Sequence, residues 1–287
     1  MMTVQMKSIF KTVKFVLRMV VMGLIACILL FPFFVMLTRS FMTAKEAVAI
    51  PSVLFPAKLN FESYVTAMDE DFFLHFGNTM MVIACNVVFV PLSGYIVAFG
   101  FAKLKFVGSG VIFAVGMSTL MLPSIVCTIP LYVLYNDLGW LNTLLPLMIP
   151  PMFGGGMMNI FLTHQFLRGI PNTYVEAARL DGAGSLRIAF TIIMPMAMPV
   201  VTYIAVNTFI AAWNDFTGPL TYISVYYSER WTLAVSVFER FRGLTGVESE
   251  LNVQAALCVV MMIPSMILFA FFQKTLINGI NMSGIKG

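Results

Sequence analysis

Long apolar stretches, each free of Asp, Glu, Lys and Arg, dominate the pattern along this chain. There are six, over residues 19–38, 72–102, 106–136, 138–167, 188–214 and 251–273. Each can form a helix that crosses a hydrocarbon layer, which takes roughly 20 residues. The strict apolar–polar alternation of barrel strands is missing. The pattern therefore predicts six transmembrane helices, near residues 17–38, 78–101, 110–133, 143–165, 195–215 and 253–273.

Composition narrows the class of protein further. Sixty per cent of the residues are hydrophobic and 10% are charged, whereas soluble domains contain about 25% charged residues. A water-soluble globule and a disordered chain are both excluded, because the latter needs low hydrophobicity and high charge. The four cysteines lie inside apolar stretches and form no C-x-x-C pair, so we expect free packing thiols. The predicted fold class is an all-α membrane protein.

The charges predict how the chain is oriented. With the N-terminus in the cytoplasm, the cytoplasmic segments hold eleven Lys or Arg and two acids, whereas the outer segments hold six and eleven. This distribution follows the positive-inside rule. We therefore expect both termini in the cytoplasm. The expected parts are an N-terminal segment 1–16, a transmembrane domain 17–287, outer loops at about 39–76 and 216–252, and a cytoplasmic loop at about 166–194.

Glycine and proline interrupt several of the apolar stretches. Membrane helices tolerate proline, because neighbouring helices bond the freed carbonyls. Gly154, Gly155 and Gly156 in the fourth stretch would let a neighbouring helix or a ligand approach closely, and helix packing is the more common role of such small residues.

Sequence motifs for catalysis and metal binding are missing. No Gly-Lys pair exists for a phosphate-binding Walker A loop, no H-E-x-x-H surrounds the two histidines, and no G-x-S-x-G is present. We expect neither a catalytic residue nor a metal site, and no bound nucleotide. The interiors of the predicted spans also lack acids and bases, with Asp215 at the outer end of the fifth span. Proton relays and ion sites generally need buried charged residues, so neither is expected here. Any transported solute is expected to be neutral and rich in hydroxyl groups.

Amides and aromatic rings in the fifth span are the best candidates for a solute pathway. Asn207, Trp213 and Asn214 could bond to and stack on a sugar. The alternative is that they make ordinary bonds between helices.

The cytoplasmic loop between the fourth and fifth spans contains an ordered segment. Thr173 followed by Glu176 predicts a capping box at the start of a helix. Gly182 predicts the C-terminal end of this helix, because glycine readily adopts the left-handed backbone conformation at which helices end. A second helix is expected to begin near Ser185 and to run towards Pro195. The segment is therefore expected to be a helix, a turn and a second helix.

The first helix of this cytoplasmic loop has a face that is suited to binding another molecule. Ala177 and Ala178 leave one side nearly flat, while Tyr174, Val175 and Leu180 provide apolar projections. Such a helix could dock in a groove of a partner protein. It could also lie on the membrane surface and brace the bundle.

The same segment resembles the "EAA" signature of ABC importer permeases, E-A-A-x3-G-x9-I-x-L-P. Here Glu176-Ala177-Ala178 is followed by Gly182, Ile192 and Met194-Pro195. Met194 in place of leucine is the one departure. Similarity to carbohydrate permeases of the maltose/glycerol-phosphate type extends to Asn60-Phe61-Glu62, Trp213-Asn214-Asp215-Phe216 and the ending Gly284-Ile285-Lys286-Gly287. Within that family the chain resembles the second, shorter permease subunit.

This resemblance implies a multi-pass, non-catalytic subunit in a prokaryotic plasma membrane. It implies assembly with a homologous permease, two copies of an ABC ATPase and an extracytoplasmic solute-binding protein, without nucleic acid. ATP and magnesium would bind to the ATPase. The outer loops would receive the binding protein, and the tail from Ser283 to Gly287 would reach the ATPase dimer. The residues expected to couple to the ATPase are Glu176, Ala177, Ala178, Arg179, Asp181 and Gly182.

Three other functions stay open at this point. An ABC permease for another solute class, such as amino acids or polyamines, would share the signature. A self-contained secondary carrier or channel, from a different class, would need no ATPase. A membrane scaffold would transport nothing.

Overall fold

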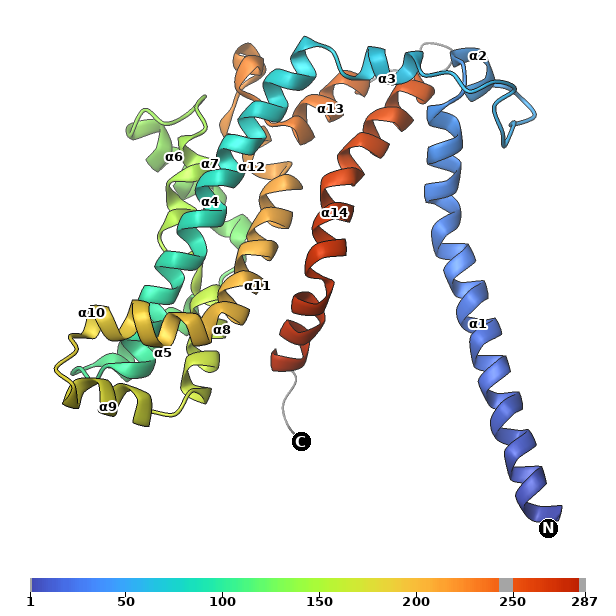
Figure 1. Ribbon diagram of the computed structural model, residues 1–287. Helices are drawn as coiled ribbons and strands as arrows, with labels where there is room; N and C mark the ends of the chain where they lie inside the picture. Colours follow the sequence, from blue (N-terminus) through green and yellow to red (C-terminus); the bar gives the residue numbers. More distant parts are fainter. Residues whose placement is uncertain (1, 243–249, 284–287) are drawn as a thin grey trace. The chain divides into compact units, whose positions relative to one another are not determined.

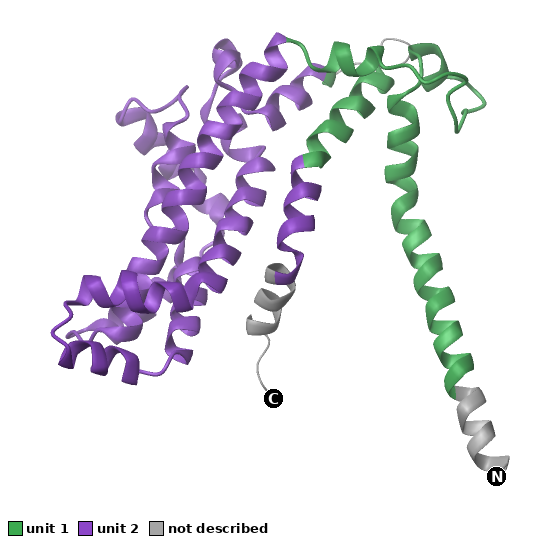
Figure 2. Ribbon diagram, viewed as in Figure 1, with its two compact units in different colours: residues 1–69, 241–263 green, residues 70–240, 264–287 purple. Residues whose placement is uncertain are grey.

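The computed structural model describes residues 2–242 and 250–283, with side chains over 11–242 and 250–274, and the regular elements in these residues are all helices. The chain divides into two compact units, residues 1–69 with 241–263 and residues 70–240 with 264–287 (Figure 2). Five helices are long and apolar enough to cross a membrane, or six if one bent pair forms a single span. The prediction of an all-α, multi-span protein is confirmed.

The first unit contains α1 (Met2–Ser40), α2 (Ala44–Ala47), α3 (Glu62–Ala67) and the first part of α14 (Leu251–Ser283). The Ser40 hydroxyl lies 2.8 Å from the Tyr64 hydroxyl, and the Asn252 amide donates to Ser63 Oγ over 2.9 Å. These bonds join the end of α1 to α3, and α3 to α14. A capping box occurs at Thr43, whose side chain and backbone pair with Glu46 at the start of α2.

The second unit contains the remaining elements (Figure 1). They are α4 (Glu70–Lys103), α5 (Ser109–Ser118), η1 (Thr119–Met121), α6 (Ser124–Asp137), α7 (Leu145–Met148), η2 (Pro150–Met152), α8 (Met157–Gly169), α9 (Thr173–Leu180), α10 (Ser185–Arg187), the π-helical segment η3 (Ile188–Ile193), α11 (Met194–Trp213), α12 (Thr217–Tyr222), η4 (Val225–Arg230) and α13 (Leu233–Phe241).

Helix α4 is the central element of the second unit, because it packs against both α8 and α11. The core between these helices includes Tyr95 and Phe99 from α4, Leu167 from α8, and Val200 and Ile204 from α11. In Figure 1, α9 lies near the end of α4 at which the helix finishes, and α12 lies beside its first half. Helix α4 therefore extends from the region of α12 to the region of α9.

The third predicted span is not one straight helix. Helices α5 and α6, with η1 between them, are bent by 101° relative to each other. Leu122 adopts an extended conformation, with φ −81° and ψ 119°, immediately before Pro123. Proline disfavours helical geometry in the residue before it. The span predicted near 110–133 is therefore divided at Pro123 into two helices.

The fourth predicted span is also interrupted. Only α8 is a regular long helix, and Gly154, Gly155 and Gly156 before it have φ values of +93°, +61° and +93°. A Cβ atom on Gly155 would overlap Cγ1 of Val90 on α4. The three glycines therefore provide backbone conformations that other residues rarely adopt, and Gly155 permits close packing against α4.

The fifth span begins earlier than predicted. Helix α10, η3 and α11 form one continuous span from Ser185 to Trp213. The second helix of the loop and the fifth span are thus one element, with the π-helical segment η3 immediately before Pro195. Local π-helical geometry is one way in which membrane helices accommodate proline.

Candidate functional site

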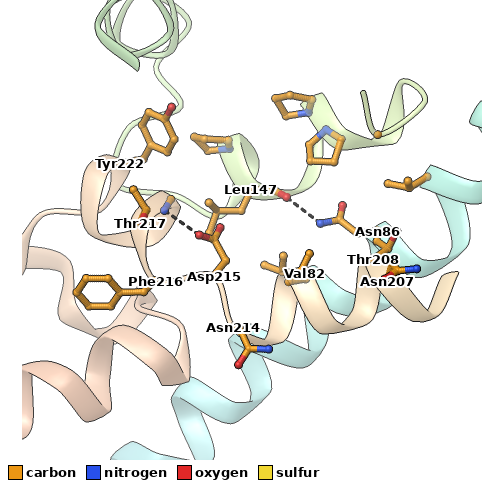
Figure 3. Close-up of a pocket in the computed structure, with 18 of the residues that line it drawn as sticks. Val82, Asn86, Leu147, Asn207, Thr208, Asn214, Asp215, Phe216, Thr217 and Tyr222 are labelled. Atoms are coloured by element: carbon orange, nitrogen blue, oxygen red, sulfur yellow. Dashed lines mark hydrogen bonds between the residues drawn. The ribbon is translucent and has the colours of Figure 1, made fainter. Parts of the chain in front are cut away.

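A pocket of about 740 Å³ with a mixed apolar and polar lining lies within the second unit, between α4, α7, η2, α11 and α12 (Figure 3). Apolar groups from Val82, Val90 and Leu147 share its wall with amide, hydroxyl and phenol groups. The polar lining residues are Asn86, Tyr135, Asn159, Asn207, Thr208, Asn214, Asp215, Thr217 and Tyr222. Small-molecule sites typically combine an apolar wall with a few placed polar groups in this way.

Asn86 has an unused acceptor. Its side chain is buried, and Nδ2 donates to the carbonyl of Leu147 over 3.0 Å, which ties α4 to α7 (Figure 3). Oδ1 has no hydrogen-bond partner among the described residues. A buried polar atom without a partner costs free energy, so this oxygen is a candidate acceptor for a hydroxyl group or a water molecule.

Asp215 carries the only charge among the described residues that line the pocket. Its Oδ1 accepts a bond from the backbone N–H of Gly218 over 2.9 Å. Burial raises the pKa of Asp215, and backbone hydrogen bonds from Gly218 and Thr217 partly oppose this rise. A Cβ atom on Gly218 would lie 2.5 Å from Asp215 Oδ2 and 2.8 Å from Leu147 Cδ2. Glycine at 218 therefore leaves room for the carboxyl group.

We expect Asp215→Asn to remove a pH dependence of stability. Because burial raises the pKa of Asp215, the folded chain holds this proton more tightly than the unfolded chain does. Below the ordinary pKa of an aspartate, the protonated Asp215 carboxyl contributes to the stability of the fold. This contribution falls as the pH rises through the raised pKa of Asp215 in the folded chain. Thermal unfolding of the purified protein between about pH 4 and pH 8 tests this.

The matched control is Asp137→Asn, since Asp137 is exposed at the end of α6. The asparagine variant at 215 should be at least as stable as the wild type at neutral pH and should lose its advantage in acid. Identical pH profiles for the wild type and Asp215→Asn would contradict the assignment.

The three residues predicted for the solute pathway do not all lie at the pocket. Asn207 and Asn214 line it, and their amides donate to Tyr203 and Ile210 one turn earlier, over 2.9 and 2.8 Å. Trp213 is absent from the lining and is buried, with its ring 6.2 Å from Phe209 and 6.1 Å from Phe76. The structure therefore places Trp213 in an aromatic packing cluster.

Sequence reasoning did not single out Asn86 and Asp215 as pathway residues. Asp215 is the first charged residue after the apolar stretch 188–214, and Asn86 is an amide within the stretch 72–102. An acid that ends one span and an amide in the interior of another were the available signals. Their convergence on one pocket depends on how α4 packs against α11.

The cytoplasmic loop helix α9 ends as predicted but begins differently. Gly182 has φ +78°, its N–H donates to Arg179, and the N–H of Ala183 donates to Ala178. These two bonds define a Schellman C-cap. At the other end, Asn172 is the N-cap and makes no side-chain cap bond. Thr173 is the first helical residue, so the capping box predicted for it was wrong.

The faces of α9 also differ in part from the prediction. Val175 and Ala178 are buried in the core formed with α4 and η3, so neither belongs to an outward face. Ala177 is exposed, as are Tyr174 and Leu180, the last with 90% of its surface accessible. The charged residues Glu176, Arg179 and Asp181 are exposed too. An outward face of mixed apolar and charged character remains.

A family model described as "Binding-protein-dependent transport system inner membrane component" matches residues 91–282. The melibiose/raffinose/stachyose import permease MelC of Bacillus subtilis is 27% identical, over 92% of this chain and 94% of the relative. The trehalose/maltose transport system permease MalG of Thermococcus litoralis is 29% identical, over 92% and 94%.

A solved structure shows the same fold. The crystal structure of a bacterial ABC transporter involved in the import of the acidic polysaccharide alginate matches with a TM-score of 0.81 at 23% identity. The match covers 90% of this chain and 95% of that chain.

The fold and the family match together define an ABC transporter permease. The chain belongs to the family of binding-protein-dependent transport system inner membrane components. It is a multi-pass, non-catalytic transport subunit of the inner membrane, in a system that depends on a binding protein and an ATPase. The prediction of an ABC importer permease is confirmed.

Proposed function

We propose that this chain forms half of the translocation pathway for a neutral sugar or related polyol, which an external binding protein delivers. The observation that carries the proposal is the composition of the pocket. Its described lining offers amides, hydroxyls, phenols and one carboxyl group, without a lysine or arginine. Anionic groups such as phosphate are commonly bound by Arg and Lys, whereas a neutral polyol needs acceptors and donors of this kind.

The named relatives support the same solute class. MelC is described as a permease for melibiose, raffinose and stachyose, and MalG as one for trehalose and maltose. All of these are neutral oligosaccharides. The alginate importer shares the fold but takes an acidic polysaccharide, so fold alone does not select the solute. The pocket chemistry is the stronger argument.

The proposed assembly contains a second, homologous permease and two copies of an ATPase. In this assembly the exposed face of α9 docks in a cleft of one ATPase, with Glu176, Ala177, Arg179, Asp181 and Gly182 at or beside the contact. The outer loops 39–76 and 216–252 receive the binding protein. The C-terminal contact predicted for Ser283 to Gly287 lies outside the described side chains, and residues 284–287 lie outside the described residues altogether.

Transport would follow from motion of the ATPase pair. Closure of the ATPases on ATP would displace α9 as a rigid body and open the pathway to the outside, and hydrolysis would reset it. The sugar would pass from its binding protein into a cavity between the two permeases. This chain would bind no nucleotide itself.

Reconstitution in lipid vesicles tests the proposal. The chain is assembled with the second permease, the ATPase and the binding protein of its own transport system. Uptake of radiolabelled melibiose, raffinose, trehalose and maltose is then compared with uptake of alginate oligomers. We expect ATP-dependent uptake of at least one neutral sugar and none of the acidic oligomer. The chain alone should neither move sugar nor bind ATP.

Other results would support the competing functions. Uptake by the chain alone would identify a secondary carrier. ATP-driven uptake of amino acids or polyamines, with no sugar transported, would identify a permease for another solute class.

A further inference from the structure

Lys103, the last residue of α4, is buried against the start of the cytoplasmic loop between α8 and α11. Its ammonium Nζ donates to the carbonyl of Ile170 over 2.5 Å and to Oδ1 of Asn172 over 2.9 Å. Only 8% of its surface is accessible. Lys105, two residues further on, is exposed. The two lysines thus have the same charge and nearly the same place in the chain but different surroundings.

A buried ammonium group needs partners, because its transfer out of water is unfavourable unless its donors are bonded. The two acceptors of Lys103 are uncharged, one a main-chain carbonyl and one a side-chain amide. Both belong to the short connection between α8 and α9. The lysine therefore holds this connection against the end of α4.

The bond to Asn172 also explains how α9 begins. Asn172 is the N-cap residue of α9, a position at which asparagine normally accepts a bond from the helix. Here its side-chain oxygen accepts from Lys103, and no side-chain cap bond is made. The first turn of α9 is thus fixed to α4 at the expense of its own cap.

A second bond joins the far side of the loop to the same helix. The hydroxyl of Tyr95, which is fully buried in α4, donates to the carbonyl of Ala189 over 2.6 Å. Ala189 lies in η3, between α10 and α11. Both ends of the loop that contains α9 are therefore bonded to α4.

Helix α4 also reaches the pocket. Asn86 lies 17 residues before Lys103 on this helix, a distance of about 26 Å at the rise of an α-helix. The Asn86 amide holds the carbonyl of Leu147 at the pocket wall. One continuous helix thus has the loop at one end and a pocket residue further along.

We propose that Lys103 is a positioning residue that transmits movement of α9 to α4, and through α4 to the pocket. The inference rests on the proposed function, because it takes α9 as the ATPase contact. It assigns the transmission of this movement to α4, the second span. The fifth span, which continues directly from the loop, would transmit it as well.

The test uses the reconstituted assembly. The solute is whichever of melibiose, raffinose, trehalose and maltose the wild type takes up fastest. Lys103→Met keeps a long apolar stem and removes the donors. We expect it to lower the amount of sugar transported per ATP hydrolysed by about tenfold. The variant loses charge-assisted hydrogen bonds, and the free energy of one such bond corresponds to about that factor. Lys103→Arg should restore most of the ratio, since guanidinium can bond both acceptors. Lys105→Met is the matched control and should behave as the wild type.

A second variant keeps the test decisive if Lys103→Met reaches the membrane poorly. Asn172→Ala removes one acceptor and should lower the ratio by itself, and adding Lys103→Met should then have a smaller effect than in the wild type. An unchanged ratio in both single variants overturns the proposal. So does loss of the ATPase from the purified Lys103→Met assembly, which would show a docking role. A wild-type assembly without ATP-driven uptake would instead overturn the proposed function and this inference with it.

Discussion

Gly182→Asp is expected to abolish transport while the chain still inserts in the membrane. Gly182 has φ +78° and closes the Schellman cap of α9. A residue with a β-carbon is less stable in this conformation by about 1–2 kcal/mol. The new carboxylate would also lie beside Asp181 at the C-terminal end of a helix, where negative charge is unfavourable. The end of α9 would therefore rearrange at the face proposed to dock on the ATPase.

The matched control for this prediction is Gly184→Asp. Gly184 has φ −71° and is the N-cap of α10, and a Cβ atom added there would meet no atom within 4 Å. Aspartate is among the preferred residues at an N-cap, so this variant should transport normally. Gly182→Asn should retain part of the activity, because asparagine tolerates the left-handed conformation.

Sugar uptake in vesicles and the amount of chain in the membrane are the two measurements for these variants. Normal uptake by Gly182→Asp would remove the coupling role from this loop. Equal loss in both aspartate variants would show that added charge, and not backbone conformation, is the cause.

Trp213→Ala is expected to destabilise the protein without a specific effect on the solute. The indole is buried between the rings of Phe76 and Phe209. Removal of a buried tryptophan costs about 3–5 kcal/mol, because the burial and the packing are both lost. The thermal unfolding temperature of the purified protein and its abundance in the membrane should both fall.

The adjacent residue provides the contrast. Asn214 is exposed and lines the pocket, so Asn214→Ala should change stability by no more than about 0.5 kcal/mol. It should lower the rate of sugar uptake per molecule of chain. If Trp213→Ala were normally abundant and stable but required more sugar for half-maximal uptake, Trp213 would belong to the pathway after all.

Local chemistry was sufficient for part of the site. Gly182 was predicted as the end of α9, because a left-handed helix stop depends on one residue and its immediate neighbours. The start of the same helix was predicted wrongly, because Asn172 bonds Lys103, which is 69 residues away. The Thr173–Glu176 pattern is a valid local signal, but the chain uses that device at Thr43 and Glu46.

For the pocket too, some lining residues could be chosen from the sequence and others could not. Asn207 and Asn214 were chosen from the sequence because they are amides in an apolar span, and both line the pocket. Trp213 was placed with them because sequence alone does not show which side of α11 faces α4. Asn86 and Asp215 come from elements far apart in the chain, and only the packing of α4 against α11 brings them to one wall.

By itself, the sequence determined the helical membrane class, the positions of the apolar stretches, the EAA pattern and the glycine stop of α9. These features depend on run length, residue type and one backbone angle, all of which are local. Only the packed structure showed which residues of α9 turn inward and that Lys103 joins α4 to the loop. Those outcomes depend on contacts between residues distant in sequence, whose free energies no single stretch of the chain contains.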